Sequence, residues 1–382
     1  MRKWSRGSQW ADLKLGDRQC KTIGRLWKYS EKGRSPNASP EPLLAGRRGA
    51  APFLFSRRRR AANVLNLRCA PGKVMLAGLW LALAAGFLAA LLVLQWLPPP
   101  PASSSLSLAG LFHDLVRYGK TKGGCGQRPA WLQYFDVPKR WFCHFYVVAV
   151  IWNGILFLWL IQSLFFSWPF PVWLQDLLHI LGEAPQDQNR GGEALSAFLV
   201  CLFVWLNSCR RLWECLHISV FSTGVIHLVQ YCFGLSYYVL VGLTVLSQVP
   251  SSVRAGKGDG LTVCWYHGLG LLMFVWASVH QQRCLVILAN LRKNKSGEVV
   301  SLDHSLPFGD WFGMVSCPHY FAEVLIYVSM GVTFGFKNLT WWLVVTYVLF
   351  NQAVSATLCH EFYLSNFKDY PKHRKAYIPF LF

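Results

Sequence analysis

Long uncharged apolar runs recur along this chain of 382 residues and constrain its fold more than any other feature. About 20 apolar residues in a helix cross the hydrocarbon core of a bilayer, where backbone polar groups must be hydrogen-bonded internally. Seven such segments are predicted, at 74–97, 145–166, 194–209, 215–253, 260–282, 320–336 and 338–360. The sequence therefore predicts an all-α integral membrane protein, a bundle of seven transmembrane helices.

Composition agrees with a membrane protein and excludes several other classes. Charged residues make up 15% of the chain, whereas soluble domains carry about 25%. The 18 tryptophans suit the aromatic belts at the two membrane interfaces. The twelve cysteines contain no CxxC pair and no zinc-type spacing with histidine, so no metal site is expected. A disordered, collagen-like or disulfide-stapled secreted protein is excluded.

Charges in the predicted loops set the orientation, because Lys and Arg in short loops stay on the cytosolic side. Segments 98–140, 292–295 and 368–375 are basic, and 167–193 is mainly acidic. Arg210 and Arg211 follow the third run, where they are expected to extend toward the interface. This alternation places the C-terminus in the cytosol and the start of the first span in the lumen.

The N-terminal segment 1–73 holds 18 Lys/Arg against 4 Asp/Glu. It is rich in Gly, Ser, Pro and Arg and shows no sustained periodicity, so no packed structure is expected. Because a lumenal tail of this charge conflicts with the positive-inside rule, we interpret it as an extension outside the packed domain 74–382. An artefact of the gene model and a real cytosolic arm both remain open. Basicity confined to one tail does not indicate nucleic-acid binding.

Polar residues within the predicted spans are functional candidates, because they are costly at membrane depth. Glu323 lies inside the sixth run, and His360 with Glu361 closes the seventh. The alternative for each is a hydrogen bond to a neighbouring helix. Arg211 and Arg292, near cytosolic helix ends, either set the topology or surround an anionic ligand.

The C-terminal segment 367–382 reads FKDYPKHRKAYIPFLF and resembles the end of the steroid 5α-reductase family of membrane NADPH reductases. Other segments resemble motifs of this family: RYGKT at 117–121, RPAW at 128–131 leading to DVP at 136–138, NLRKNKSG at 290–297, PFGDWF at 307–312 and HEFY at 360–363. The likeness covers about 74–382 and leaves out the basic tail.

The resemblance implies a seven-helix fold of the steroid 5α-reductase type, whose C-terminal part (about 200–382) binds NADPH from the cytosolic side. A pocket accessible to lipid is expected beside it. By matching position, the cofactor-binding residues are expected to be Arg211, Arg292, His319, Glu323, His360 and Tyr363. Asp136 takes the place of the catalytic carboxylate that polarises the substrate ketone. The family also implies a location in the endoplasmic reticulum membrane, and we expect a monomer.

Three positions depart from the family pattern. Phe135 stands where the steroid enzymes have glutamine, and Ser208 stands where they have the catalytic tyrosine. His319 stands where an asparagine is usual near the nicotinamide. The first two argue against a 3-keto steroid, although reduction of a 4-ene-3-keto steroid remains the alternative. They leave the proton donor unidentified.

Within the family the likeness is greatest to the branch that acts on polyprenal, a long-chain isoprenoid aldehyde. Hydride addition to a C=C bond needs a place for the developing charge, which a conjugated aldehyde oxygen provides and an allylic alcohol does not. We therefore expect NADPH-dependent reduction of the α-isoprene double bond of polyprenal, rather than polyprenol, in dolichol synthesis for N-glycosylation. The competing classes are a lipid transporter, a class often built from internal repeats, and a methyltransferase with a sulfonium cofactor.

Overall fold

The computed structural model describes residues 75–96, 108–122, 129–182, 192–257 and 260–382. All of them belong to one compact unit. The basic segment 1–73, predicted to lie outside the packed domain, falls outside the described residues.

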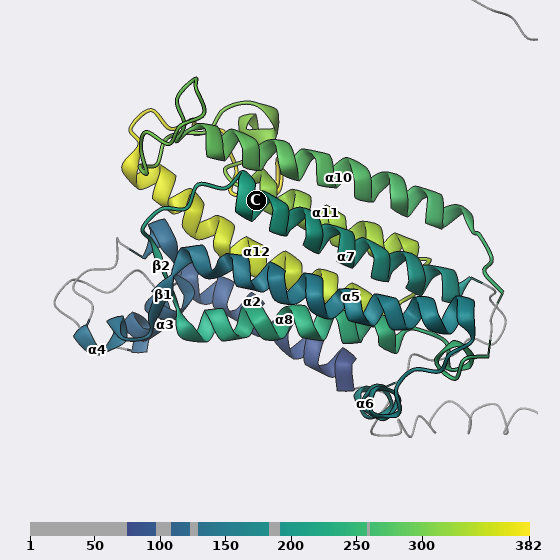
Figure 1. The fold of residues 1–382 in the computed structure, drawn as a ribbon. Helices are drawn as coiled ribbons and strands as arrows, with labels where there is room; N and C mark the ends of the chain where they lie inside the picture. The colour runs from purple at the N-terminus through teal and green to yellow at the C-terminus, as the bar shows by residue number, and fades with distance from the viewer. Residues whose placement is uncertain (1–74, 97–107, 123–128, 183–191, 258–259) are drawn as a thin grey trace, which may run out of the picture. The chain divides into compact units, whose positions relative to one another are not determined.

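Six of the described helices are long and apolar enough to cross a bilayer, and they run side by side in Figure 1. They are α2 (Met75–Trp96), α5 (Phe142–Phe166), α7 (Glu193–His217), α8 (Leu228–Ser247), α10 (Trp265–Asn290) and α12 (Leu339–Asn366). The predicted all-α, multi-pass membrane architecture is confirmed.

The sixth predicted span, 320–336, corresponds to α11 (Pro318–Thr333). At 1.5 Å per residue its 16 residues reach about 24 Å, less than the roughly 30 Å of a hydrocarbon core. Helix α11 packs against α10 and α12. Gly270 in α10 permits the close approach, because a Cβ atom there would clash with the Thr333 hydroxyl of α11. The shorter helix α11 is thus held inside the bundle by its neighbours.

The predicted continuous span 215–253 is wrong in its first half. Helix α7 ends at His217, three residues into the predicted span. The chain then forms the short strand β2 (Val225–His227). Helix α8 begins only at Leu228, where His227 Nδ1 accepts a hydrogen bond of 3.1 Å from the Val229 amide. This cap satisfies an amide at the helix start and separates α7 from α8.

Short elements gather at one end of the bundle, where α3, α4, β1 and β2 lie together in Figure 1. At this end lie α3 (Leu108–Val116), η2 (Gly119–Thr121), α4 (Ala130–Gln133), β1 (Asp136–Pro138) and η3 (Lys139–Trp141). The other short helices are α6 (Val172–Leu181), α9 (Ser251–Arg254) and η4 (Asp310–Gly313), and α6 lies at the opposite end of the bundle in Figure 1. Strands β1 and β2 pair antiparallel, with Asp136 opposite His227. This pairing joins the segment before α5 to the start of α8.

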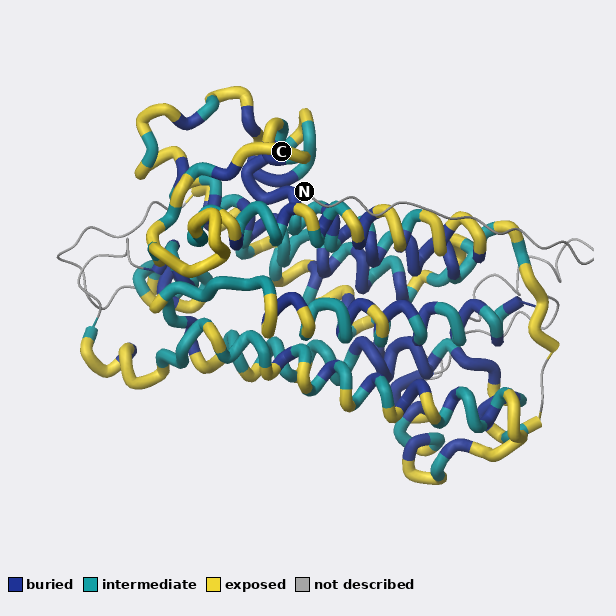
Figure 2. Tube along the Cα trace, turned by 45° about the horizontal axis from the view of Figure 1, so that its top comes forward, coloured by how far each residue is buried: buried dark blue, intermediate teal, exposed yellow. Residues whose placement is uncertain are grey.

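Buried residues line the faces where the long helices meet, and exposed residues lie on their outer sides (Figure 2). Trp80 of α2 is fully buried, and its Nε1 donates a 3.0 Å hydrogen bond to the Thr244 hydroxyl of α8. Its ring also contacts Tyr237 of α8 and Tyr347 of α12. On α10, by contrast, Leu272 is 69% exposed, as expected for a side chain that faces lipid.

Candidate active site

A cavity of about 770 Å³ lies inside the bundle. Residues from α2, α5, α7, α8, α10, α11 and α12 line it, together with the segment around η2 and the loop after α10. Tyr347 and Tyr363 of α12 both line it, and a separation of 16 helical residues corresponds to about 24 Å along the axis. The cavity is therefore long enough for two different groups to lie end to end.

One end of the cavity is basic. Lys120, Lys139 and Arg292 line it, and none of them forms an ion pair with a carboxylate in the part of the chain that the structure describes. The Lys120 ammonium lies 3.8 Å from the centre of the Tyr363 ring. Positive charges without carboxylate partners are the surroundings that a phosphate group needs. The basic end therefore fits an anionic ligand.

His304 lies beside these cations. Its Nε2 is 3.0 Å from Arg292 Nη2, and Arg292 also donates to the Val220 carbonyl at 2.5 Å. Burial, followed by the charges of Lys120 and Arg292, lowers the pKa of His304 to about 4. His304 is thus neutral at physiological pH and leaves the positive charge of this end to the lysines and the arginine.

Two arginines of α7 face inward rather than extending to the membrane interface, which corrects the prediction for Arg210 and Arg211. Glu214 is fully buried, and its carboxylate pairs with Arg210 at 2.7 Å and with Arg211. Arg211 also donates to the Tyr146 hydroxyl at 3.1 Å. The sequence prediction missed Glu214, which lies one turn further along α7 and holds both guanidinium groups in the bundle.

Glu323 of α11 lies on the cavity wall. Gln281 of α10 connects it to Arg210, which is paired with Glu214. The Gln281 carbonyl oxygen accepts a hydrogen bond from Arg210, and its amide nitrogen donates to the Glu323 carboxylate. Gln281 also donates to the His319 carbonyl at 3.2 Å. The amide orients the Glu323 carboxylate, which the sequence alone did not reveal.

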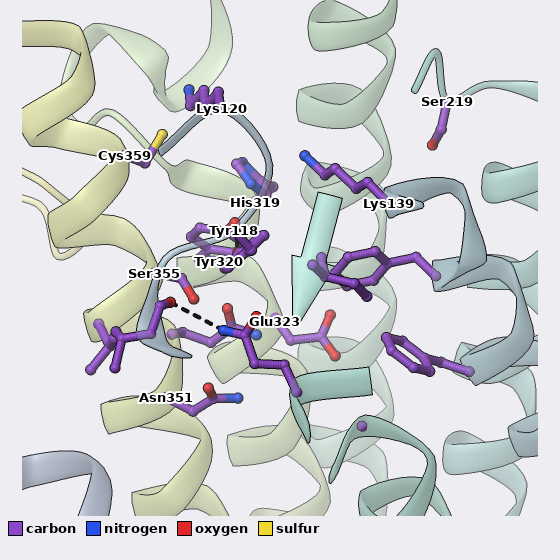
Figure 3. Close-up of a pocket in the computed structure, with 18 of the residues that line it drawn as sticks. Tyr118, Lys120, Lys139, Ser219, His319, Tyr320, Glu323, Asn351, Ser355 and Cys359 are labelled. Carbon is purple, nitrogen blue, oxygen red and sulfur yellow. Dashed lines mark hydrogen bonds between the residues drawn. The ribbon is translucent and has the colours of Figure 1, made fainter. Parts of the chain in front are cut away.

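Three hydroxyl groups meet on the cavity wall between the basic end and Glu323 (Figure 3). The oxygens of Tyr118 and Tyr320 are 2.9 Å apart, and the Ser355 hydroxyl lines the cavity beside them. Burial raises the pKa of Tyr118, so its hydroxyl keeps its proton at neutral pH. The cluster joins α11, α12 and the segment before η2.

The structure places most of the predicted cofactor-binding residues on the cavity wall. Those that line it are Arg211, Arg292, His319, Glu323 and Tyr363. His360 is not among its described lining residues. Its Nδ1 lies 2.6 Å from the Ser316 hydroxyl, whereas the preceding residue, Cys359, lines the cavity beside Lys120 (Figure 3).

Asp136, predicted as the catalytic carboxylate, is likewise outside the lining that the structure describes. Its carboxylate forms an ion pair with Lys122, whose Nζ lies 2.9 Å from Asp136 Oδ1. The same ammonium lies 3.4 Å from Asp114 Oδ2. Ser208 donates to the Val204 carbonyl of its own helix at 2.7 Å. Asp136 and Ser208, the two positions matched to steroid catalysis, therefore lie off the cavity wall.

Comparison with known proteins decides the family. Over 312 residues the chain is 60% identical to the human protein named polyprenal reductase, a match that covers 80% of this chain and 96% of that protein. The chain belongs to the steroid 5α-reductase family. Residues 225–382 match the family described as 3-oxo-5-alpha-steroid 4-dehydrogenase.

Other relatives in the family agree. The polyprenal reductase of Ailuropoda melanoleuca is 60% identical over 312 residues, covering 80% of this chain and 96% of that protein. That of Xenopus tropicalis is 57% identical over 313 residues, covering 81% of this chain and 99% of that protein. The chain is accordingly an oxidoreductase that acts on a CH–CH group, as the sequence predicted.

Proposed function

We propose that this protein reduces the α-isoprene double bond of polyprenal, giving dolichal, with NADPH as the reductant. The observation that carries the proposal is one continuous cavity with chemically different ends. Lys120, Lys139 and Arg292 mark the basic end, and the cavity extends to aromatic and aliphatic walls on α2, α8 and α12. Such a cavity suits a phosphate-bearing cofactor next to an apolar substrate.

The residues of the basic end fit a dinucleotide with phosphate groups. The three cations of this end, Lys120, Lys139 and Arg292, would hold the phosphates. Arg211, also predicted to contact the phosphates, lines the same cavity but pairs with Glu214. His319 Nδ1 is buried and has no hydrogen-bond partner among the described residues, so a polar ligand group in the cavity would satisfy it. Bound NADPH supplies a hydride. The chain's own residues bind the cofactor, orient Glu323 through Gln281 and surround the reacting groups with protein rather than water.

The apolar walls fit an isoprenoid chain. Phe87 of α2 and Phe233 of α8 both line the cavity, with their ring centres 5.9 Å apart, and Val348 of α12 lines it as well. In an isoprenoid aldehyde with a conjugated double bond, the negative charge that develops during reduction moves to the aldehyde oxygen, where hydrogen-bond donors can stabilise it. The aldehyde is therefore the favoured substrate over the corresponding alcohol.

We further propose that the protein works as a monomer in the endoplasmic reticulum membrane with its C-terminus in the cytosol, in dolichol synthesis for N-glycosylation. The basic residues Lys368, Lys372 and Lys375 after α12 support this orientation. An epitope at the C-terminus should be accessible to antibody after selective permeabilisation of the plasma membrane. An epitope accessible only after the internal membranes are dissolved would reverse the orientation.

A substrate panel tests the function directly. Purified full-length protein in detergent micelles is given NADPH with polyprenal, polyprenol or a 4-ene-3-keto steroid, and the products are separated by mass spectrometry. The proposal predicts conversion of polyprenal to dolichal and no turnover of polyprenol in the absence of an oxidising enzyme. Reduction of the steroid but not the isoprenoid would transfer the assignment to steroid reduction.

A further inference from the structure

The proposed reaction needs a proton donor, and Asp136 lies off the described cavity wall in an ion cluster with Lys122. Once the β-carbon of the enal has accepted a hydride, the electrons of the C=C bond move toward the carbonyl and negative charge develops on its oxygen. A buried donor at that oxygen lowers the barrier, and general acid catalysis contributes about 100-fold or more. The donor must line the cavity and carry a proton at neutral pH.

The hydroxyl cluster of Tyr118, Tyr320 and Ser355 meets both conditions. Each of the three lines the cavity, and the Tyr118 and Tyr320 hydroxyls are hydrogen-bonded to each other. The Tyr118 and Tyr320 hydroxyls carry two hydrogens, and their mutual hydrogen bond uses only one of them. One O–H therefore remains for a group in the cavity.

The surroundings decide which of the two hydroxyls is better suited. When Tyr320 donates to the Tyr118 oxygen, the Tyr118 hydrogen is the one left to donate. Burial raises the pKa of Tyr118, whereas the Ser355 and Tyr320 side chains lower it, because they stabilise the phenolate that remains after its proton has gone. Glu323 is less suited, because its carboxylate accepts a hydrogen bond from Gln281 and in its ionised form has no proton to give.

We propose that Tyr118 is the catalytic acid, supported by Tyr320 and Ser355; this inference rests on the proposed function. As the β-carbon accepts the hydride, the C=C bond becomes single, the carbonyl becomes an enolate, and the Tyr118 hydroxyl protonates its oxygen. A proton from water, passed through the hydroxyl cluster, restores the phenol. The enol then returns its O–H proton to solvent and gains one at the α-carbon, so that one hydride and one proton have been added overall.

The test compares Tyr118→Phe with the unmodified full-length protein. The kcat is expected to fall about 100-fold, while the Kd for NADPH measured without substrate stays the same. A larger solvent deuterium isotope effect on kcat is also expected, because protonation becomes rate-limiting. Tyr134→Phe changes a tyrosine that is 88% exposed and serves as the control with unchanged kcat.

Tyr320→Phe removes the hydrogen bond that supports Tyr118 and is expected to lower kcat less, about tenfold. It also keeps the test decisive if Tyr118→Phe fails to bind NADPH. An unchanged kcat in either binding-competent variant would overturn the inference. The comparison is made on whichever conjugated carbonyl the unmodified protein reduces, so the failure of polyprenal as substrate and the failure of Tyr118 as donor give different results.

Discussion

Lys122 and Asp136 form an ion pair in which Nζ and Oδ1 are 2.9 Å apart, and the Lys122 side chain is 2% exposed. The pair links the end of η2 to strand β1. Because Tyr118 and Lys120 belong to the same short segment as Lys122, this contact helps to hold both of them at the cavity. This geometry favours a positioning role for Asp136, and the catalytic role that the family resemblance implies stays a prediction.

Asp136→Asn separates these two roles. Loss of one charge from the pair is expected to lower the free energy of unfolding by about 1–3 kcal/mol. The loss is limited because Lys122 keeps Asp114 as a partner. Thermal unfolding in detergent should show the lower Tm, and kcat should fall less than about tenfold. Glu361→Gln, at an ion pair whose carboxylate side chain is 45% exposed, is the control with little change. A large loss of kcat at unchanged Tm would return Asp136 to a catalytic role.

Removal of a cavity cation should weaken cofactor binding. Lys139→Met is expected to raise the KM and Kd for NADPH about tenfold, with a small effect on kcat, because a phosphate loses one charged partner. Tryptophan fluorescence quenching measures the Kd. Lys368→Met removes an exposed lysine of the C-terminal segment after α12 and should leave both constants unchanged. Equal effects of the two substitutions would place the phosphates elsewhere.

The position of Cys359 on the cavity wall predicts that its thiol is protected by the cofactor. Modification of Cys359 by a small maleimide, followed by peptide mass spectrometry, should slow in the presence of NADPH. Cys359→Ser should remove the protected peptide signal, and Cys201, which is buried in α7 away from the described lining, should show no dependence on NADPH. Protection of Cys201 but not Cys359 would contradict the placement.

His304 predicts a pH dependence of stability. Its pKa is about 4 in the folded protein and about 6.5 in an unfolded chain, so the unfolded state binds more protons between these values. Its contribution to stability is complete above about pH 6.5 and is lost as the pH falls toward 4. His304→Gln should therefore show a smaller drop in Tm from pH 7.5 to 5. An identical drop in both proteins would show that His304 does not titrate this way.

The sequence predicted the membrane architecture because hydropathy and length are local properties. It placed Arg292, Glu323 and Tyr363 in a region that the structure brings to one cavity. It named His360 as a cofactor-binding residue and missed Cys359. Neighbouring residues on a helix point about 100° apart, and a sequence motif does not show which of them faces the cavity. Only the packing of α12 shows that Cys359 faces the cavity.

Interactions between helices explain the other differences. The orientation of Arg210 and Arg211 depends on Glu214, one turn away on α7, and an uncharged-run criterion excludes such a buried carboxylate from a span. The break after His217 is stabilised by the β1–β2 pairing, a contact between segments about 90 residues apart. Apolar composition alone cannot reveal such long-range contacts.

The most direct test of the central claim follows the hydride itself. Polyprenal is incubated with the purified protein and NADPH that carries deuterium on the hydride-donating carbon, and the product is analysed by mass spectrometry and NMR. Reduction of the α-isoprene double bond predicts dolichal with one deuterium on its β-carbon. Deuterium on the carbonyl carbon of an otherwise unsaturated alcohol, or an undeuterated product, would contradict the account.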